Sequence, residues 1–294
     1  MLFSEKYSLT EEIGKGRSRQ FGRTFSGVSK NSGKKVLLKF VSAKDHPNGV
    51  ARLKNERTFT FSFSGLPEII DFFESESECI LVRNFEEGST LQDYWKHLTK
   101  KERIPFLIVF FEKFIPLFDI MNVEGIVHCD IKPSNIIIRP NSTSFEVAMI
   151  DFGLAIRSSQ PEKRKILFPL GFAAPELLLN ELDLVDHRTD LFALGITIWN
   201  LFTGELPLTH PNPSIFTNLQ VTHPLPDHSS IPKGLYPILL KMSHKHIFRT
   251  APNLLNQEDR KKSLIQGMSG RYHSSTEILK DLQSIPNKKR WFGF

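Results

Sequence analysis

The sequence predicts an α+β protein in which a small β-rich part precedes a larger, mainly helical part. Three observations carry this prediction. Short β-forming runs fill the first third of the 294 residues, a connection containing Gly88 follows them, and the remainder is mostly helical in character. The composition, with 40% apolar and 24% charged residues, is that of a globular chain with a substantial core.

The first third contains five candidate strands and one candidate helix. Residues 49–61 start with polar and charged positions and carry apolar ones at Leu53 and Phe59, which favours a helix. Asn31-Ser32-Gly33 predicts a hairpin turn. We therefore expect an N-lobe over about 1–85 and a hinge over about 83–88. The expected strands are residues 7–13, 21–29, 35–41, 68–73 and 79–82.

Residues 89–285 are expected to form the helical C-lobe. Residues 102–123 carry a dense apolar face, and Pro116 should kink or interrupt that helix. Residues 190–202 are apolar nearly all round, which predicts a buried helix that ends at Gly204.

The last part of the chain combines an irregular segment with one short helix. Residues 209–232 are rich in proline, histidine and asparagine, so we expect them to be irregular. Residues 276–285 predict a short amphipathic helix, and a basic, aromatic tail over 286–294 follows it.

Charge, apolar runs and cysteine content restrict the functional classes. The formal net charge of +6 comes from scattered basic residues, so we predict no nucleic-acid partner. The longest apolar run, 106–111, is far shorter than the roughly twenty residues that span a bilayer, and the amino terminus does not read as a signal peptide. Cys79 and Cys129 indicate reduced thiols, which favours a cytoplasmic protein. The sequence does not indicate the oligomeric state.

The most informative stretch is His128-Cys-Asp-Ile-Lys-Pro-Ser-Asn135, followed by Asp151-Phe-Gly153. It supplies a carboxylate at Asp130, an ammonium group at Lys132 and a carboxamide at Asn135, with a second carboxylate at Asp151. Phosphoryl transfer from a nucleotide needs such groups to orient a hydroxyl, to offset phosphate charge and to hold magnesium. The alternative is a strand–turn–strand that carries these residues by chance, and their ordered spacing disfavours it.

These motifs resemble the catalytic loop and metal-binding motif of eukaryotic-like serine/threonine protein kinases. The resemblance spans residues 7–285. It implies a bilobal α+β fold whose N-lobe has a five-stranded antiparallel sheet and one helix, and whose C-lobe is larger and mainly helical. It also implies ATP and Mg²⁺ as cofactors and a protein as substrate.

The resemblance assigns roles residue by residue. Asp130 would accept the proton of the substrate hydroxyl, Lys132 would neutralise the transferred phosphate, and Asn135 and Asp151 would bind Mg²⁺. Supporting roles fall to His128, Phe152, Gly153, Glu176 in Ala-Pro-Glu, Asp190 beneath the catalytic loop, and Arg271 as the salt-bridge partner of Glu176.

A glycine-rich turn and a strand lysine would bind the nucleotide. Backbone amides approach phosphate where side chains are absent, as at Gly14 and Gly16. Lys39 resembles the phosphate-binding lysine of the third strand, and Glu56 would pair with it, whereas Glu68 is a weaker candidate. The implied nucleotide-binding residues are Ile13, Gly14, Lys15, Gly16, Phe21, Leu37, Lys39, Glu56 and Ile137.

Several positions depart from the family pattern. Arg19 replaces a usual glycine, and the bulky Phe21 and Leu37 either narrow the adenine pocket or stack on a lifted base. Arg83, or a residue one position away, occupies the gatekeeper position, which is normally uncharged. Cys129 replaces an arginine that pairs with a phosphorylated activation segment in many kinases. We therefore expect activity without that phosphorylation.

Pro169 also departs from the pattern, because serine/threonine kinases usually have a threonine there. The choice of Ser/Thr as acceptor then rests on Lys132. Three hypotheses follow: an active serine/threonine protein kinase, a pseudokinase scaffold that binds partners with little or no phosphotransfer, and a small-molecule phosphotransferase of related fold. The first is favoured because Lys39, Asp130, Asn135 and Asp151 are all present.

Overall fold

A computed structural model describes residues 3–14, 22–158, 168–248 and 250–286. The chain forms two compact units. The first comprises residues 1–88 and 137–155, and the second comprises residues 89–136 and 156–294. One division thus falls beside Gly88, where the sequence predicts the end of the hinge. Residues 137–155, which the sequence assigns to the C-lobe, belong to the first unit.

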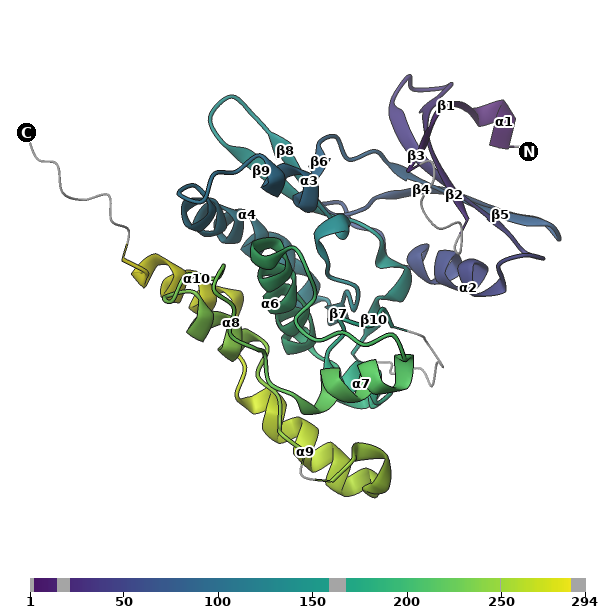
Figure 1. Ribbon diagram of the computed structural model, residues 1–294. Coiled ribbons are helices and arrows are strands. Elements are labelled where there is room, and N and C mark those ends of the chain that lie inside the picture. The colour runs from purple at the N-terminus through teal and green to yellow at the C-terminus, as the bar shows by residue number, and fades with distance from the viewer. Residues whose placement is uncertain (1–2, 15–21, 159–167, 249, 287–294) are drawn as a thin grey trace, which may run out of the picture. The chain divides into compact units, whose positions relative to one another are not determined.

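The first unit contains a five-stranded antiparallel sheet in the order β1-β2-β3-β5-β4 (Figure 1). The predicted fold class is confirmed, and every expected strand forms. The hairpin between the second and third strands turns through Gly33, whose φ of 69° costs a glycine nothing. The elements are the short helix α1 (Phe3–Lys6), β1 (Tyr7–Ile13), β2 (Arg23–Ser29), β3 (Lys35–Ser42), β4 (Ile69–Glu74) and β5 (Glu78–Asn84).

Alternation of side chains along β3 gives the sheet two buried faces. Val36 and Leu38 pack in one apolar cluster, whereas Val41 packs with Leu53 of α2 (Pro47–Glu56) in another. Because Lys39 shares the parity of Val41, it lies on the face that α2 covers.

The helix α2 is shorter than the expected 49–61. It begins at Pro47, whose missing N–H costs nothing in a first turn, and it ends at Glu56. Beyond it, Phe59 and Phe61 are buried, with their ring centroids 6.2 and 5.3 Å from that of Phe152. This packing explains why the segment leaves the helix.

The strands β8 (Ile136–Pro140) and β9 (Phe145–Met149) lead to the 3₁₀ turn η2 (Phe152–Leu154). Contacts between residues that are far apart in the sequence connect this region to the rest of the first unit. The Met149 amide donates to the Gly65 carbonyl over 2.8 Å, and Arg139 lies 3.6 Å from Glu86. Periodicity along the chain cannot show such contacts.

The second unit is mainly helical, as predicted. Its helices are α3 (Leu91–Lys96), α4 (Arg103–Val123), α5 (Pro175–Leu178), α6 (His187–Thr203), α7 (Pro213–Thr222), α8 (Tyr236–Met242), α9 (Gln257–Ser269) and α10 (Ser275–Ser284). The short strands β6 (Ser89–Thr90), β7 (Ile126–Val127) and β10 (Ile156–Arg157) and the 3₁₀ turns η1 (Pro133–Asn135), η3 (Leu182–Leu184) and η4 (Pro252–Leu254) complete it.

Buried apolar residues hold α4 and α6 in the core of this unit. In α4, successive rings of Phe106, Phe110, Phe114 and Phe118 stack with centroids 6.1, 5.5 and 5.4 Å apart. The helix α4 carries this buried stack of rings and continues through Pro116, so the expected interruption does not occur. The helix α6 ends at Gly204, whose φ of 84° is left-handed, as predicted.

The expectation of an irregular segment over 209–232 is wrong in part, because α7 lies within it. The Asn212 side chain caps this helix by accepting from the amides of Ser214 and Ile215, and Pro213 occupies the first turn. Asn-Pro is thus a helix start here, although the composition indicated a loop. Across the ranges that the structure describes, no helix combines the length and the apolar character needed to cross a membrane.

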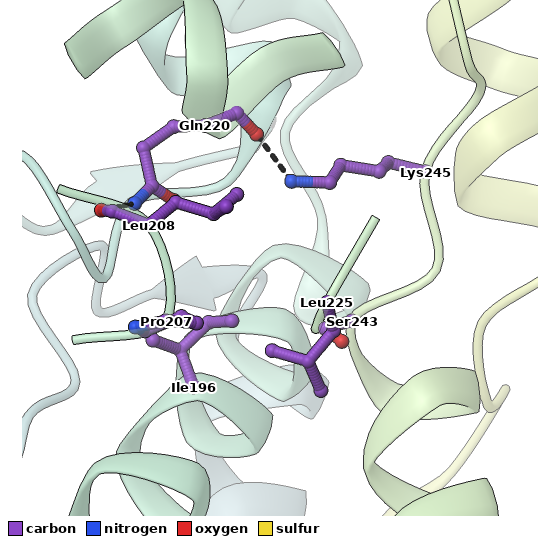
Figure 2. Close-up of a pocket in the computed structure, with 7 residues that line it drawn as sticks. All are labelled: Ile196, Pro207, Leu208, Gln220, Leu225, Ser243 and Lys245. Carbon is purple, nitrogen blue, oxygen red and sulfur yellow. Dashed lines mark hydrogen bonds between the residues drawn. The ribbon is translucent and has the colours of Figure 1, made fainter. Parts of the chain in front are cut away.

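A half-buried lysine borders a small pocket of the second unit (Figure 2). Lys245 Nζ donates to the Gln220 backbone carbonyl over 2.5 Å, and Gln220 Nε2 donates to the Leu208 carbonyl over 2.8 Å. Burial, and to a smaller extent the positive charge of Arg271, lower the pKa of Lys245 to about 7. The lining residues are Ile196, Pro207, Leu208, Gln220, Leu225, Ser243 and Lys245.

Candidate active site

Lys39 on β3 binds two carboxylates of the first unit. Its Nζ lies 2.8 and 2.6 Å from the two carboxylate oxygens of Glu56 and 3.0 Å from Asp151 Oδ1. The Glu56 side chain is 2% exposed, whereas that of Asp151 is 40% exposed. The structure thus brings together three residues that the resemblance implies, and one of the two carboxylates faces solvent.

The charges in this cluster depend on one another. Burial alone would lower the pKa of Lys39, but Asp151 and Glu56 offset this and hold the pKa above its ordinary value. Burial raises the pKa of the Glu56 carboxyl, and Lys39 opposes that rise. Lys39 is therefore a cation that the two carboxylates stabilise.

Asn55 fixes the segment that follows Asp151. Its Nδ2 donates to the carbonyls of Gly153 and Ala155 over 3.1 and 2.9 Å. Asp151 itself adopts a left-handed backbone with φ 70° and ψ 67°, and Phe152 is fully buried. Asn55 is not among the site residues that the sequence predicts, and its position beside Glu56 on α2 is the signal that points to it.

Arg83 on β5 is a further cation of the first unit. Its side chain is almost fully buried, and Glu56 and Asp151 are both close enough to stabilise its charge. The sequence singles out this position only as an unusual gatekeeper.

The structure describes some of the remaining nucleotide-binding candidates, and the others lie outside the described residues. Leu37 on β3 and Ile137 on β8 are both buried in the first unit, Ile13 ends β1, and Gly14 has a φ of 73°. Lys15, Gly16, Arg19 and Phe21 lie outside the described residues.

Asp130 lies in the second unit, between two side chains that bind it. Lys132 Nζ is 2.9 and 2.8 Å from the two carboxylate oxygens, and Asn135 Nδ2 donates to the Asp130 carbonyl and to Oδ2 over 2.9 and 3.0 Å. Pro133–Asn135 forms the 3₁₀ turn η1, which returns the Asn135 amide toward Asp130. Asp130 therefore contacts both of the other residues that the resemblance assigns to this loop.

Asp190 of α6 holds the backbone of this loop. Its carboxylate accepts from the amides of His128 and Cys129 over 2.7 and 2.9 Å. Burial raises the pKa of the Asp190 carboxyl to about 7, although these amides favour the charged form. Cys129 has a φ of 61°, and the Asp130 amide donates to His128 Nδ1 over 3.2 Å. The loop conformation thus depends on buried polar bonds.

The second unit also contains a fully buried ion pair, away from the loop of Asp130. Arg271 donates to the two oxygens of Glu176 over 2.6 and 2.9 Å, and Thr189 Oγ1 donates to Glu176 over 2.8 Å. The Arg271 and Glu176 side chains are 1% and 0% exposed. The resemblance implies this pair, and the Thr189 contact is an addition to it.

The chemistry of Asn135 and Asp151 suits a hard cation. Asn135 uses its nitrogen toward Asp130, so Oδ1 is the atom suited to a metal, and the Asp151 carboxylate is solvent-accessible. The two residues belong to different units. No group of three or more His, Cys, Asp or Glu residues suited to a metal ion occurs within the described part of the chain.

The comparison with protein families decides the identity of the fold. Residues 7–268 match the profile of the protein kinase domain. The chain belongs to the protein kinase family. This match includes residues of both compact units and confirms the resemblance to protein kinases.

Curated relatives of this kinase chain come from animals and bacteria. It is 29% identical over 221 residues to myosin light chain kinase, smooth muscle, from Gallus gallus, covering 71% of this chain and 11% of the relative. It is 26% identical over 262 residues to serine/threonine-protein kinase pkn2 from Myxococcus xanthus, covering 83% of this chain and 31% of the relative. It is 24% identical over 262 residues to the probable serine/threonine-protein kinase PknB from Lactococcus lactis, covering 84% of this chain and 40% of the relative.

The chain therefore spans well under two thirds of the length of each of these relatives. What it shares with them is the kinase domain.

Proposed function

We propose that this kinase transfers the γ-phosphate of ATP to serine or threonine hydroxyls of protein substrates. The observation that carries the proposal is the contact of Asp130 with both Lys132 and Asn135. A buried carboxylate beside an ammonium group can accept a proton while the adjacent cation offsets phosphate charge. The names of the bacterial relatives support serine/threonine as the acceptor class.

The transfer assigns one task to each group. The substrate oxygen forms a bond to the γ-phosphorus while the bond from that phosphorus to the β–γ bridging oxygen breaks, and ADP leaves with the bond electrons. Asp130 accepts the hydroxyl proton. Lys132 offsets charge on the transferred phosphoryl group, and Lys39, held by Glu56, binds the phosphates of the nucleotide.

Mg²⁺ is part of the proposal. Asn135 Oδ1 and the Asp151 carboxylate would hold it, and when bound it neutralises charge on the phosphate oxygens. The partial exposure of Asp151 and the orientation of the Asn135 amide support this assignment.

We also propose that activity needs no phosphorylation of the activation segment. Cys129 stands where an arginine would bind a phosphate, and it is buried. Burial and the nearby carboxylates raise the pKa of its thiol, so it is a neutral group with no charge to offer a phosphate. Ser158 Oγ donates to the Gly125 carbonyl over 3.1 Å, and residues 159–167 lie outside the described ranges. A large rate gain after phosphorylation of Ser158 or Ser159 would refute this part.

The cytoplasm is the proposed compartment, because Cys79 and Cys129 are both buried free thiols. The proposed partner is a protein substrate. The buried Glu176–Arg271 pair, which the resemblance associates with protein-directed kinases, supports this choice over a small-molecule acceptor.

Phosphate transfer by wild type and by Asp130→Asn tests the proposal. We expect radiolabelled γ-phosphate to reach a serine/threonine peptide library and a general protein substrate with wild type, and the variant to lose about 100-fold or more of that rate. Asp119→Asn, a change of the same type on the exposed surface of α4, is the matched control and should transfer as wild type does.

Other outcomes select the alternatives. Nucleotide binding without transfer would favour a pseudokinase scaffold, an outcome that the bulk of Leu37 makes worth testing. Transfer to amino alcohols or aminoglycosides but not to protein would favour a small-molecule phosphotransferase.

A further inference from the structure

Arg83 shares the sheet face of Lys39. In the register of β3 and β5, Arg83 pairs with Leu37, and Leu81 pairs with Lys39. Paired residues of adjacent antiparallel strands project from the same face, and so do residues two apart on one strand. Arg83 and Lys39 therefore both project toward the side that α2 covers.

The Arg83 side chain is buried to 1% exposure, and its hydrogen bonds are incomplete. Its Nη1 donates to the Asn84 carbonyl over 2.9 Å, whereas its Nε has no partner among the described residues. Buried donors are normally satisfied, and an unsatisfied one costs free energy. Such a donor in a charged cluster is suited to an acceptor that arrives with a ligand.

Arg83 remains charged despite this burial. Burial lowers the pKa of the guanidinium below its ordinary value, and the charges of Glu56, Asp151 and Glu86 limit that fall. A guanidinium keeps its proton in proteins. Glu86 also has partners of its own, because Asn84 Nδ2 donates to it over 2.7 Å and Arg139 lies 3.6 Å away.

The cluster of Lys39, Arg83, Glu56 and Asp151 therefore holds two cations and two carboxylates. If phosphate oxygens recruit Lys39, Arg83 stays within electrostatic reach of both carboxylates. The positive charge of Arg83 then neutralises part of the negative charge at this site. In a kinase with an uncharged residue at this position, Mg²⁺ alone would have to neutralise that charge. The same charge weakens the attraction of Asp151 for a divalent cation.

We propose that Arg83 is a resident cation of the triphosphate site, which lets this chain bind a nucleoside triphosphate with a reduced requirement for divalent metal. The inference rests on the proposed function, because it takes Lys39 and Asp151 as the phosphate and metal site. In this role Arg83 is a positioning residue.

The test is a comparison of ATP binding in excess EDTA and in Mg²⁺, measured by titration calorimetry on the whole chain. Arg83→Met removes the charge with an unbranched side chain, and Arg83→Lys keeps it. Arg57→Met is the matched control, because Arg57 is an exposed arginine of the same unit that stacks on Phe72. Thermal unfolding of each variant shows whether it is folded, and Arg83→Gln is a second neutral variant if Arg83→Met unfolds.

We expect wild type to bind ATP in EDTA and the neutral variant to bind it about tenfold more weakly, since losing an interaction equivalent to one pKa unit changes an equilibrium constant about tenfold. The Mg²⁺ concentration for half-maximal tightening should fall in Arg83→Met. Arg83→Lys should stay within about threefold of wild type, and Arg57→Met should not change.

Two results separate the failure of this inference from that of the proposed function. Binding of Mg²⁺–ATP with no binding in EDTA, or equal binding by wild type and the folded neutral variant in EDTA, would overturn the inference alone. Absence of ATP binding by wild type under both conditions would overturn the proposed function, and this inference with it.

Discussion

Two cation–carboxylate clusters in this kinase differ in how completely they are buried. In the second unit, Arg271 and Glu176 are fully buried and bind each other through two hydrogen bonds. In the first unit, Lys39 binds Glu56 and also Asp151, whose carboxylate is 40% exposed. The first cluster can therefore exchange a partner for a ligand, whereas the second cannot.

The same ion-pair chemistry is thus closed to solvent in one place and open to an incoming ligand in the other. A buried pair with all of its bonds made costs much free energy when one side is removed. A cluster open to solvent loses less stability, because water or a neighbouring cation replaces the lost partner.

The largest effect is expected for Arg271→Met. It leaves the Glu176 carboxylate buried without its cation and should lower the free energy of unfolding by about 3–5 kcal/mol. Urea unfolding measures this change. Lys262→Met breaks an exposed pair with Glu258 and is the control, with an expected loss of less than about 1 kcal/mol. Similar losses in the two variants would contradict the distinction between buried and exposed pairs.

The next effect is on activity. Lys39→Met should lower kcat/KM for phosphate transfer by about 100- to 1000-fold, since a charge that stabilises the phosphates is lost. Its unfolding free energy should fall by less than that of Arg271→Met, because Asp151 is open to solvent and Arg83 stays near Glu56. Lys35→Met, on the same strand but paired with the exposed Glu87, should keep wild-type kinetics. The contrast fails if Lys39→Met destabilises the chain more than Arg271→Met does.

A smaller effect is expected for Asn55→Ala, which removes both donors to Gly153 and Ala155. The loss should be about 2 kcal/mol in stability, because two buried carbonyls lose their partners. Amide exchange of residues 152–155 should accelerate more than that of β1. Asn141→Ala, in an exposed turn, is the control. Unchanged exchange at 152–155 would show that Asn55 does not hold this segment.

The smallest effect concerns pH. The pKa of Lys245 is about 7 in the folded chain, against an ordinary value of 10.5, so between these values the unfolded chain binds more protons. Stability contributed at this residue should therefore rise with pH across that window, by up to about 1.4 kcal/mol per pH unit. Lys245→Met should flatten the difference between unfolding free energies at pH 7 and pH 9. An identical pH slope in the variant would show that Lys245 stays protonated throughout.

Local patterns in the sequence predict most of the elements, whereas the residues of the clusters come from the resemblance to protein kinases. The five strands follow from short β-forming runs, and the end of α6 follows from Gly204. Asp130 and Asn135 lie close together in one loop, but the sequence does not predict the bond that the structure shows between them.

Contacts between residues far apart in the sequence could not be predicted. Asn55 donates a hydrogen bond to Gly153, which lies 98 positions further along the chain, and the composition around neither residue indicates this bond. The association of residues 137–155 with the first unit has the same origin. The start of α7 at Pro213 was missed for another reason, since proline and asparagine are typical both of loops and of the first turn of a helix.

The two bonds from Asn55 have a consequence for inhibitors. Because Asn55 and Glu56 are neighbours on α2, a compound that displaces this helix must also break the bonds to Gly153 and Ala155 or carry that segment, and Asp151 with it, to a new position. An allosteric ligand on α2 would then displace both Glu56, the partner of Lys39, and Asp151, the carboxylate proposed to bind Mg²⁺.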